Sequence, residues 1–503
     1  MRRSMLNFET LLQDVPLPDQ RLRRRAAKLV QSMVRGHSPS SLGCLAPADD
    51  TQEAFTRGAY RFFDHEGVTR TALHAPMQAR LREQVSPSQT ACVAHDVSVL
   101  NYTGHQRKED LIPVGNDHTF GYELFQTLVI VEGSPIGAAV TELRAQSGVL
   151  SSLCDEPLPF VDHLEQAERA VDAVEKLLPQ RHLIHLFDRE FDDVKLLRHL
   201  ADRRYVVRCR NLSRLVAVHG QQRSLGTHLL SLKLQPVGEV TRRLARGQAT
   251  YELRVAQTQV TLVRPSLRGV QKRRQKPQPG APLTVRVVVS ELHREGEKTL
   301  RWVLLTNLAE PAFSVVERYL CRWKIERLFY FEKIGFRLEC WHQENAERIA
   351  RRLLLVQMAA SCVYQLSAAS DDKSVQLRQT LAKLGGWSGR RKDPVGPTML
   401  LRGALLFLGA MQLIQIHTKQ ELFVIAVETA LSSDGFGPPP AQIRTGSATA
   451  SGSCLGFWRR SAPRARGDTS AQKESTGSAS GASASRSLRL AVLGVAMPGA
   501  TAA

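Results

Sequence analysis

The chain has 503 residues, of which 43% are hydrophobic, so it is long enough for about two to four domains with at least one sizeable core. Its formal net charge is +20 and its sequence pI is about 10.0, which favours a polyanionic partner, most simply nucleic acid. A basic tail does not account for this charge. Residues 435–503 hold 8 Lys and Arg and 2 Asp and Glu, so residues 1–434 retain a net charge of +14.

The 8 Cys residues are scattered and contain no CxxC pair, which argues against a zinc site or a disulfide framework and indicates free thiols in a reducing compartment. The N-terminus lacks an apolar segment of signal-peptide length. The longest apolar stretches are interrupted by Gln357 or Arg402, so we expect no membrane-spanning segment and no membrane partner. These features predict an intracellular protein.

The N-terminal region, residues 1–80, predicts two or three short basic helices. Residues 18–35 place apolar side chains on one helical face and most of the Arg and Lys residues elsewhere. A second helix is expected to start at Asp50 or Thr51, with Glu53 in the capping-box position. Such helices suit a compact DNA-binding module, although basic amphipathic helices are also ordinary solvated faces.

Residues 91–100 predict a buried strand with a polar pair, His95 and Asp96, in its middle. Two further strands should follow, joined by a hairpin at residues 132–135. A carboxylate inside an apolar strand must be neutralised, hydrogen-bonded or metal-bound. For a single Asp in a strand, a structural role is the more common explanation.

Residues 163–210 predict a β-α-β pattern. A helix at 163–178 precedes a short apolar strand at 183–187 that ends in Asp188, and a helix and the strand 204–210 follow. Asp188 therefore lies at the carboxyl end of its strand, where ligand sites of α/β sheets gather. Three acidic neighbours are candidate helix N-caps instead: Glu190, Asp192 and Asp193.

The remaining regions divide by composition. Residues 211–312 read as a mostly β insertion, with an exposed basic loop at 266–282 that is either simply solvated or contacts phosphate. Residues 337–434 predict further helices. From 435 onward the sequence is of low complexity and is expected to be disordered, without an assigned function. The predicted divisions are 1–80, 81–210, 211–312, 313–370, 371–434 and 435–503.

Residues 313–336 predict a single helix of about six turns that is buried on most sides. At about 100° per residue, four polar side chains share an arc of about 60° on one face. These are Tyr319, Arg322, Glu326 and Lys333. A metal ion and a phosphate backbone would satisfy all four, whereas the simpler alternative is an Arg322–Glu326 ion pair with a solvent-reaching Lys.

Three carboxylates now come from separate elements of one α/β core: Asp96, Asp188 and Glu326. Such a set can hold two Mg²⁺ ions and leave positions for water and phosphate. Two ions of this kind stabilise the attacking and leaving oxygens of a phosphoryl transfer. The sequence therefore predicts metal-dependent chemistry on a phosphodiester.

The spacing Tyr319, Arg322, Glu326, Lys333 resembles the YREK signature of insertion-sequence transposases of the DDE class. The stretch HDVSVLNY is similar to their first-Asp region, and FDREFDD is similar to their D-R-E motif. GAYRF near residue 58 and LAKLGGW near residue 384 resemble their N-terminal DNA-binding and C-terminal regions. The resemblance extends over about residues 15–420.

The resemblance implies an RNase H-like mixed-sheet catalytic core, interrupted by the β-rich insertion and flanked by N-terminal and C-terminal helical regions. It also implies a homodimer in the synaptic complex. By resemblance, the three carboxylates bind two Mg²⁺ ions, for which Mn²⁺ could substitute. The candidate DNA-binding residues are Tyr319, Arg322, Lys333, Trp302, Arg208 and Arg210. Trp302 matches a tryptophan that stacks on a flipped base in some relatives, and a buried strand Trp is the equal alternative.

Relatives of this kind act on double-stranded DNA, both the element ends and the target. The 3′-hydroxyl made by hydrolysis attacks the opposite strand, water reopens the resulting hairpin, and the freed end joins target DNA. Two alternatives stay open: an RNase H-like nuclease without strand transfer, and an inactive DNA-binding regulator of transposition. For the transposase we expect a cytoplasmic, nucleoid-associated location in a bacterium.

Overall fold

The computed structural model describes residues 15–35, 51–115, 118–244, 247–263, 282–297, 299–387, 395–416 and 489–491, together with Leu12, Leu42 and residues 45–46. The described residues between Val15 and Gln412, with the short segment at 489–491, belong to one compact unit. The predicted basic loop at 266–282, except its last residue Pro282, and nearly all of the predicted low-complexity tail lie outside the described residues. The predicted domain divisions stay predictions.

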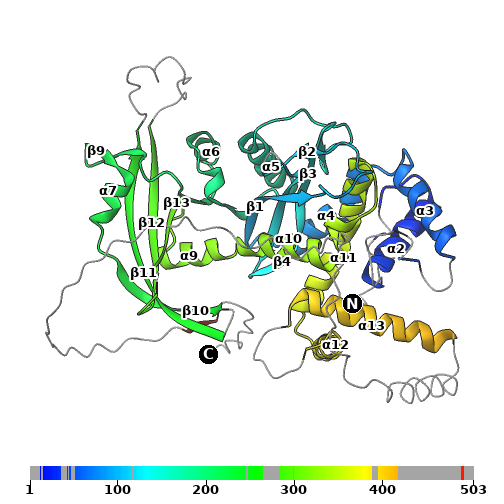
Figure 1. The fold of residues 1–503 in the computed structure, drawn as a ribbon. Helices are drawn as coiled ribbons and strands as arrows, with labels where there is room; N and C mark the ends of the chain where they lie inside the picture. The colour runs from blue at the N-terminus through cyan, green and yellow to red at the C-terminus, as the bar shows by residue number, and fades with distance from the viewer. Residues whose placement is uncertain are drawn as a thin grey trace, which may run out of the picture. The chain divides into compact units, whose positions relative to one another are not determined.

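Runs of helices and runs of strands follow one another along the chain (Figure 1). The helices are α2 (Gln20–Arg35), α3 (Gln52–Asp64), α4 (Arg70–Gln84), α5 (His163–Leu177), η2 (Arg189–Phe191), α6 (Val194–His199), α7 (Leu225–Leu230), α9 (Ala312–Leu320), α10 (Trp323–Tyr330), η3 (Phe331–Gly335), η4 (Leu338–Cys340), α11 (Ala346–Ala368), α12 (Asp372–Leu384) and α13 (Pro397–Ile416). The strands are β1 (Thr90–Asn101), β2 (Ile112–Pro113), β3 (Phe120–Val131), β4 (Ser134–Ala145), β5 (Gly148–Ser151), β6 (His182–Phe187), β7 (Tyr205–Arg208), β8 (Leu215–Val218), β9 (Gln221–Ser224), β10 (Gln235–Leu244), β11 (Gly247–Leu262), β12 (Leu283–His293), β13 (Leu300–Thr306) and β14 (Arg489–Ala491).

The strands form one mixed sheet in the order β14-β10-β11-β12-β13-β7-β6-β1-β3-β4-β5. The β1–β6 and β6–β7 pairs are parallel, whereas β1–β3, β3–β4 and β13–β7 are antiparallel. The strands of the predicted insertion therefore continue the sheet that carries β1 and β6, because β13 pairs with β7. The protein is mixed α/β, with helices flanking a large mixed sheet.

Two predicted connections are confirmed in detail. The hairpin between β3 and β4 turns at Glu132 and Gly133, both with positive φ, of 50° and 73°. This conformation suits the Gly and matches the right-handed twist of the strands. The β-α-β unit of α5, β6, α6 and β7 is also present, and it places Asp188 directly after β6.

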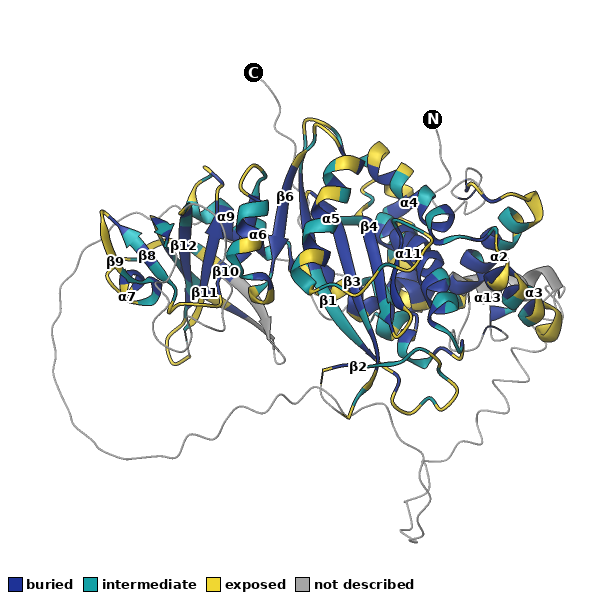
Figure 2. Ribbon diagram, turned by 90° about the horizontal axis from the view of Figure 1, so that it is seen from above, coloured by how far each residue is buried: buried dark blue, intermediate teal, exposed yellow. Residues whose placement is uncertain are grey.

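Helices cover both faces of the β1–β3–β4 part of the sheet. On one face, Gln126 of β3 bonds Glu332 of η3, and Thr141 of β4 bonds Gln357 of α11. On the other face, Glu142 of β4 accepts a hydrogen bond from Gln166 of α5. Figure 2 shows these strands coloured as buried and α5 exposed on its outer side. The sheet is therefore the middle layer of three.

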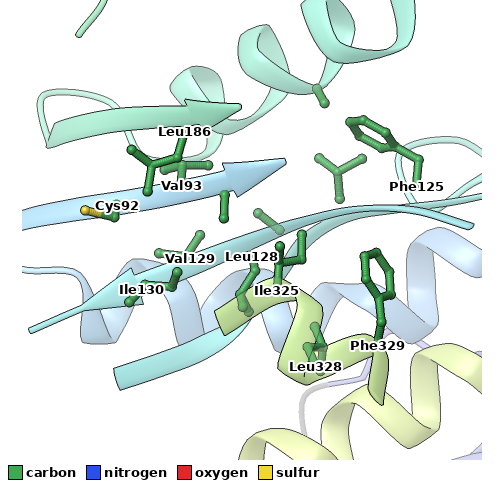
Figure 3. Close-up of a cluster of buried hydrophobic side chains, with 14 of the residues drawn as sticks. Cys92, Val93, Phe125, Leu128, Val129, Ile130, Leu186, Ile325, Leu328 and Phe329 are labelled. Atoms are coloured by element: carbon green, nitrogen blue, oxygen red, sulfur yellow. The ribbon is translucent and has the colours of Figure 1, made fainter. Parts of the chain in front are cut away.

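Apolar side chains tie α10 to this sheet. Ile325, Leu328 and Phe329 are buried, and Figure 3 shows them turned from α10 toward the strands that carry Leu128 and Cys92. Burying side chains of this size contributes about 1.5–3 kcal/mol each. Helix α10 is therefore fixed against β1 and β3, next to Asp96.

At the N-terminal end of the chain, α2 packs on α3 and on α11. Thr51 caps α3 by accepting a hydrogen bond from the amide of Ala54, which confirms one of the two predicted helix starts. The predicted capping box is wrong, because with Thr51 as the cap Glu53 lies one position too early. Glu53 instead forms an exposed ion pair with Arg57.

Among the described helices none is by itself long and apolar enough to cross a membrane, and only α11 with α12, a pair bent by 112°, passes on length and composition.

Candidate active site and nucleic-acid interface

Strand alternation puts Asp96 and Asp188 on the same face of the sheet. In the parallel β1–β6 ladder, Ala94 is opposite Leu186 and His95 is opposite Phe187. Asp96 and Asp188 are the next positions, so both side chains lie on the face of Ala94 and Leu186. We call this the carboxylate face, and we call the opposite side, which carries His95 and His185, the histidine face.

Arg322 joins the carboxylate face to α10. Its Nη1 donates to Oδ2 of Asp96 at 2.8 Å, and its Nη2 forms an ion pair with Glu326 one turn further along. The Arg322 side chain is 3% exposed, whereas the Glu326 side chain is 53% exposed. The predicted Arg322–Glu326 ion pair is therefore present, but it is one half of a fork whose other half holds Asp96.

Tyr319 and Arg208 hold Asp188. The Tyr319 hydroxyl donates to Oδ1 of Asp188 at 3.3 Å, and Nη1 of Arg208 lies 3.5 Å from the same oxygen. Trp302 of β13 is 9% exposed, and its ring packs edge-on against Tyr319 with the ring centroids 6.1 Å apart. Arg208, a predicted DNA contact, thus contacts a carboxylate, and Trp302 packs as a largely buried strand residue. The proposed base stacking by Trp302 stays a prediction.

The last member of the predicted stripe, Lys333, lies at the far end of β1. Its Nζ donates to the carbonyl of Val99 and lies 3.4 Å from Oε1 of Glu339. Lys333 is 23% exposed. It therefore lies beside the strand that carries Asp96, at the end where β1 leaves the core.

The predicted single helix over 313–336 is wrong in its continuity. Helix α9 ends at Leu320, and the amides of Arg322, Lys324 and Ile325 bond carbonyls only three residues back. This tightened turn carries Arg322 from one helix to the next. After Tyr330 the chain widens into a π-helix, η3, a form found frequently at functional sites.

The prediction that this segment is buried on most sides is also wrong. Trp323, Tyr330 and Ile334 are 41%, 59% and 55% exposed. They recur at spacings of seven and four residues and so form an exposed apolar stripe. Only the opposite side of α10 packs on the sheet.

Two of the three acidic neighbours of Asp188, Asp192 and Asp193, have other tasks. Asp193 caps α6 by accepting from the amide of Lys195. Asp192 accepts from the backbone amide of Arg210 at 2.7 Å and pairs with Arg214 at 2.8 Å. Asp188 makes no capping hydrogen bond. Asp188 therefore stays the predicted site carboxylate, and Arg210, a predicted DNA contact, is exposed next to Asp192.

The carboxylates influence one another electrostatically. Burial raises the pKa of Asp96 to about 7, although Arg322 and the amide of Val97 oppose the rise, and the charges of Glu326 and Asp188 add to it. Burial disfavours the charge of Arg322, but Tyr319 and the three carboxylates outweigh it and raise the pKa of that guanidinium. The site thus concentrates negative charge around one buried cation.

The donor chemistry of the site fits a hard divalent cation, because three carboxylates within electrostatic reach of one another supply only oxygen ligands. Within the described residues, however, no three His, Cys, Asp or Glu side chains lie close enough together to hold one ion. The guanidinium of Arg322 supplies the positive charge between Asp96 and Glu326 instead. Asp96, Asp188 and Glu326 would be the ligands if Arg322 moved to another partner.

Sequence reasoning missed one buried acid of this face. Glu332 is fully buried in η3 and accepts from Nε2 of Gln126 with both carboxylate oxygens at 3.0 Å. Burial raises its pKa to about 7. It stands next to Lys333 in the sequence, and only the π-turn directs it into the core, so no periodicity signal could have found it.

A second surface of interest lies on the N-terminal helices. Both α2 and α3 bury an apolar side, and the basic side chains Arg21, Arg24, Arg57 and Arg61 are exposed. The guanidinium of Arg25 crosses Gly58, where an added Cβ would lie 2.8 Å from its Cζ. The small residue in GAYRF therefore lets α2 and α3 pack closely.

Residues 7–68 match the family described as transposase DNA-binding. This segment includes α2 and α3, and the match supports a transposase that binds DNA. No curated protein matches the chain.

Proposed function

We propose that the protein is a DNA transposase of the DDE class, which binds the terminal inverted repeats of its own mobile element, cleaves the ends and joins them to target DNA. Asp96, Asp188 and Glu326 are its metal ligands, and two Mg²⁺ ions, or Mn²⁺ in their place, are the cofactor. The observation that carries the proposal is the fork of Arg322, which connects Asp96 and Glu326. A transposase DNA-binding segment in the same chain supports it.

The roles of the side chains follow from their contacts. When bound, the metal ions would activate water and stabilise the charge on the transferring phosphoryl group. Arg322 holds the carboxylates in register before DNA arrives, and a guanidinium pairs equally well with phosphate. Tyr319 and Arg208 orient Asp188. Lys333 lies at the end of β1, beside the strand that carries Asp96, and offers a second cation to the DNA backbone.

In the proposed reaction the three carboxylates would hold the metal ions, and the ions would supply the positive charge that brings the nucleophilic oxygen into line with the scissile phosphate. Water cleaves one strand and leaves a 3′-hydroxyl. That hydroxyl attacks the opposite strand to give a hairpin, a second water opens the hairpin, and the freed 3′-end attacks target DNA. We expect two copies of the chain to act together on a pair of ends, in the nucleoid of a bacterium.

The test uses the full chain, Mg²⁺ and a DNA duplex with the inverted repeats that flank the gene. Wild-type protein should give nicks, hairpins and joined products. Glu326→Gln should reduce cleavage by roughly 10³-fold or more while leaving DNA binding intact. Glu317→Gln on α9 is the matched control, because Glu317 makes no contact with the three carboxylates, and it should cleave as the wild type does.

The other outcomes separate the alternatives. Nicks without hairpins or joined products would identify an RNase H-like nuclease. Binding without cleavage in either metal would identify a DNA-binding regulator. Full cleavage by Glu326→Gln would refute the assignment of the site.

A further inference from the structure

A chain of hydrogen bonds crosses the histidine face directly behind the two aspartates. His95 of β1 and His185 of β6 are both fully buried, and Nε2 of His95 lies 2.9 Å from Nδ1 of His185. Nδ1 of His95 lies 3.0 Å from the hydroxyl of Thr127, and Nε2 of His185 lies 3.0 Å from Oε1 of Glu175. All four ring nitrogens therefore have a partner.

The partners fix the direction of this chain. A carboxylate only accepts, so Nε2 of His185 carries the proton that is donated to Glu175. Nδ1 of His185 must then accept from Nε2–H of His95, and Nδ1 of His95 accepts the hydroxyl proton of Thr127. Both rings are neutral in this arrangement. Burial also lowers the pKa of each ring, which keeps the rings neutral at physiological pH.

The chain lies where the backbone ladder stops. The last pair of the β1–β6 ladder is His95 with Phe187, so no ladder pair joins Asp96 to Asp188. Asp96 is still held from its other side, by its pairing with Gln126 of β3. The β6–β7 ladder also ends at Phe187. Asp188 therefore projects beyond the last pair on both of its neighbouring strands.

Side chains on the histidine face clamp this end of the two strands. The ring of His95 stacks on Phe187 with the centroids 4.4 Å apart and the planes 6° from parallel. The His95–His185 bond joins β1 to β6 one residue before Asp96 and three residues before Asp188, and Glu175 ties the pair to α5. A slip at this point would displace both aspartates together.

We propose that His95 and His185 are positioning residues, which set the distance between Asp96 and Asp188 through the hydrogen bond between their rings. This inference rests on the proposed function for its activity readout. The two histidines lie on the face opposite Asp96 and Asp188, so they would act from behind the sheet. This positioning depends on a His at both positions, because each ring supplies one partner of the hydrogen bond.

A pair of substitutions at one position isolates the bond between the rings. In His185→Asn, the side-chain oxygen takes the place of Nδ1 and can still accept from His95, but the bond to Glu175 is lost. In His185→Gln, the terminal amide takes the place of Nε2 and can still donate to Glu175, but the bond to His95 is lost. Asn is the smaller side chain, so loss of packing alone would harm it more.

We expect His185→Gln to cleave roughly 10- to 100-fold more slowly and to need more Mg²⁺ for half-maximal rate, since outer partners of metal ligands have effects of this size. His185→Asn should retain most of the rate, and both variants should bind DNA as the wild type does. His199→Gln, at a partly exposed His bonded to Asp172, is the matched control. Equal losses in the two variants, or a larger loss for Asn, would overturn the proposal.

Hydrogen exchange tests the clamp without DNA or metal, so it still decides if the wild type does not cleave and the proposed function fails. Amides at the end of β6 and after it, residues 186–188, should exchange faster in His185→Gln than in His185→Asn, while amides of the β3–β4 ladder match. Equal exchange would refute the clamp. If neither variant folds, Thr127→Val and Thr127→Ser test the hydrogen-bond chain at its Thr127 end. Amide exchange at residues 186–188 should be faster in Thr127→Val, which lacks the hydroxyl, and unchanged in Thr127→Ser, which keeps it. Identical exchange in the two variants would refute the clamp.

Discussion

The two faces of the β1–β6 pair solve the problem of buried polar groups in opposite ways. On the carboxylate face, charged groups share one long side chain, Arg322, whose partners on either side differ in exposure from 17% for Asp96 to 53% for Glu326. On the histidine face, neutral rings are held by each other, by Thr127 and by Glu175. We expect the carboxylate face to exchange Arg322 for a ligand, whereas the histidine face keeps the same hydrogen-bond partners.

This difference shows how a single strand can serve both tasks. Successive residues of a strand point to opposite faces, so His95 and Asp96 are adjacent in sequence but lie in separate environments. A buried charge persists only with a partner, and a partner that can also bind phosphate is suited to a site that receives DNA. A neutral pair needs no such exchange.

The largest effect is expected from Arg322. Arg322→Met keeps the length of the side chain but removes the charge and the fork, so cleavage should fall by about 10²–10³-fold. Arg322→Lys keeps the charge without the two-pronged geometry, and it should fall between the wild type and Met. Single-turnover cleavage measured against Mg²⁺ concentration tests this order. Wild-type rates for Arg322→Met would mean that the fork is only a structural ion pair.

The two faces should also respond to pH with opposite signs. Asp96 has a pKa of about 7 in the folded protein, above its ordinary 3.8. Between these two values the folded state binds a proton that the unfolded state has lost. The free energy of unfolding therefore falls as pH rises from about 4 to 7. His95 and His185 have lowered pKa values, so their contribution is complete above about pH 6.5 and is lost as pH falls below it. The two slopes overlap between about pH 4 and 6.5.

Urea unfolding of the metal-free protein from pH 4.5 to 8 measures both slopes. In the wild type, the free energy of unfolding should fall by on the order of 3–4 kcal/mol as pH rises across this range, and Asp96→Asn should remove this fall. His185→Asn should flatten the loss on the acid side instead. If both substitutions tilted the curve in the same direction, the faces would not differ in the way described.

Much of this arrangement was predictable from sequence, because it depends on local patterns. The strand around Asp96, the end of the strand at Asp188 and the Tyr-Arg-Glu spacing each carry their own signal, and the structure connects them through Arg322 and Tyr319. The mixed α/β class follows from the same alternation of strands and helices. The metal-ligand roles themselves stay predictions.

What could not be predicted depends on tertiary contacts. The break before Trp323 and the π-turn at residues 331–335 contradict the smooth helix that composition favours, because burial of Arg322 and Glu332 determines the local backbone. The bond between His95 and His185 joins residues 90 apart. No single-sequence pattern reports such a pairing, and it follows only once the register of β1 with β6 is known.

Further from the sheet, the basic side of α2 offers a smaller and separable effect. Arg21 and Arg24 are exposed, so replacing both with Gln should weaken DNA binding by about 10–30-fold and reduce the log–log salt slope by about 2, one unit for each lost phosphate contact. Filter binding between 50 and 200 mM salt, on the order of physiological strength, measures both quantities. The control replaces Arg82 and Lys176, exposed on α4 and α5, and an equal loss there would mean that binding reflects net charge alone.

The smallest effect separates burial from function on the carboxylate face itself. Glu332 lies on that face and has a pKa of about 7 like Asp96, but neutral amides hold it, and it touches none of the three carboxylates. Glu332→Gln should therefore raise stability by about 1–2 kcal/mol at pH 8, where the ionised acid is unfavourable, and hardly change it at pH 5, where the acid is already protonated. Cleavage should be unaffected, with Glu339→Gln as a partly exposed control for stability. If Glu332→Gln abolished cleavage at unchanged stability, the active site would extend along η3. Glu332, which is held by a neutral amide and not by a cation, would then belong to the residues that act on DNA.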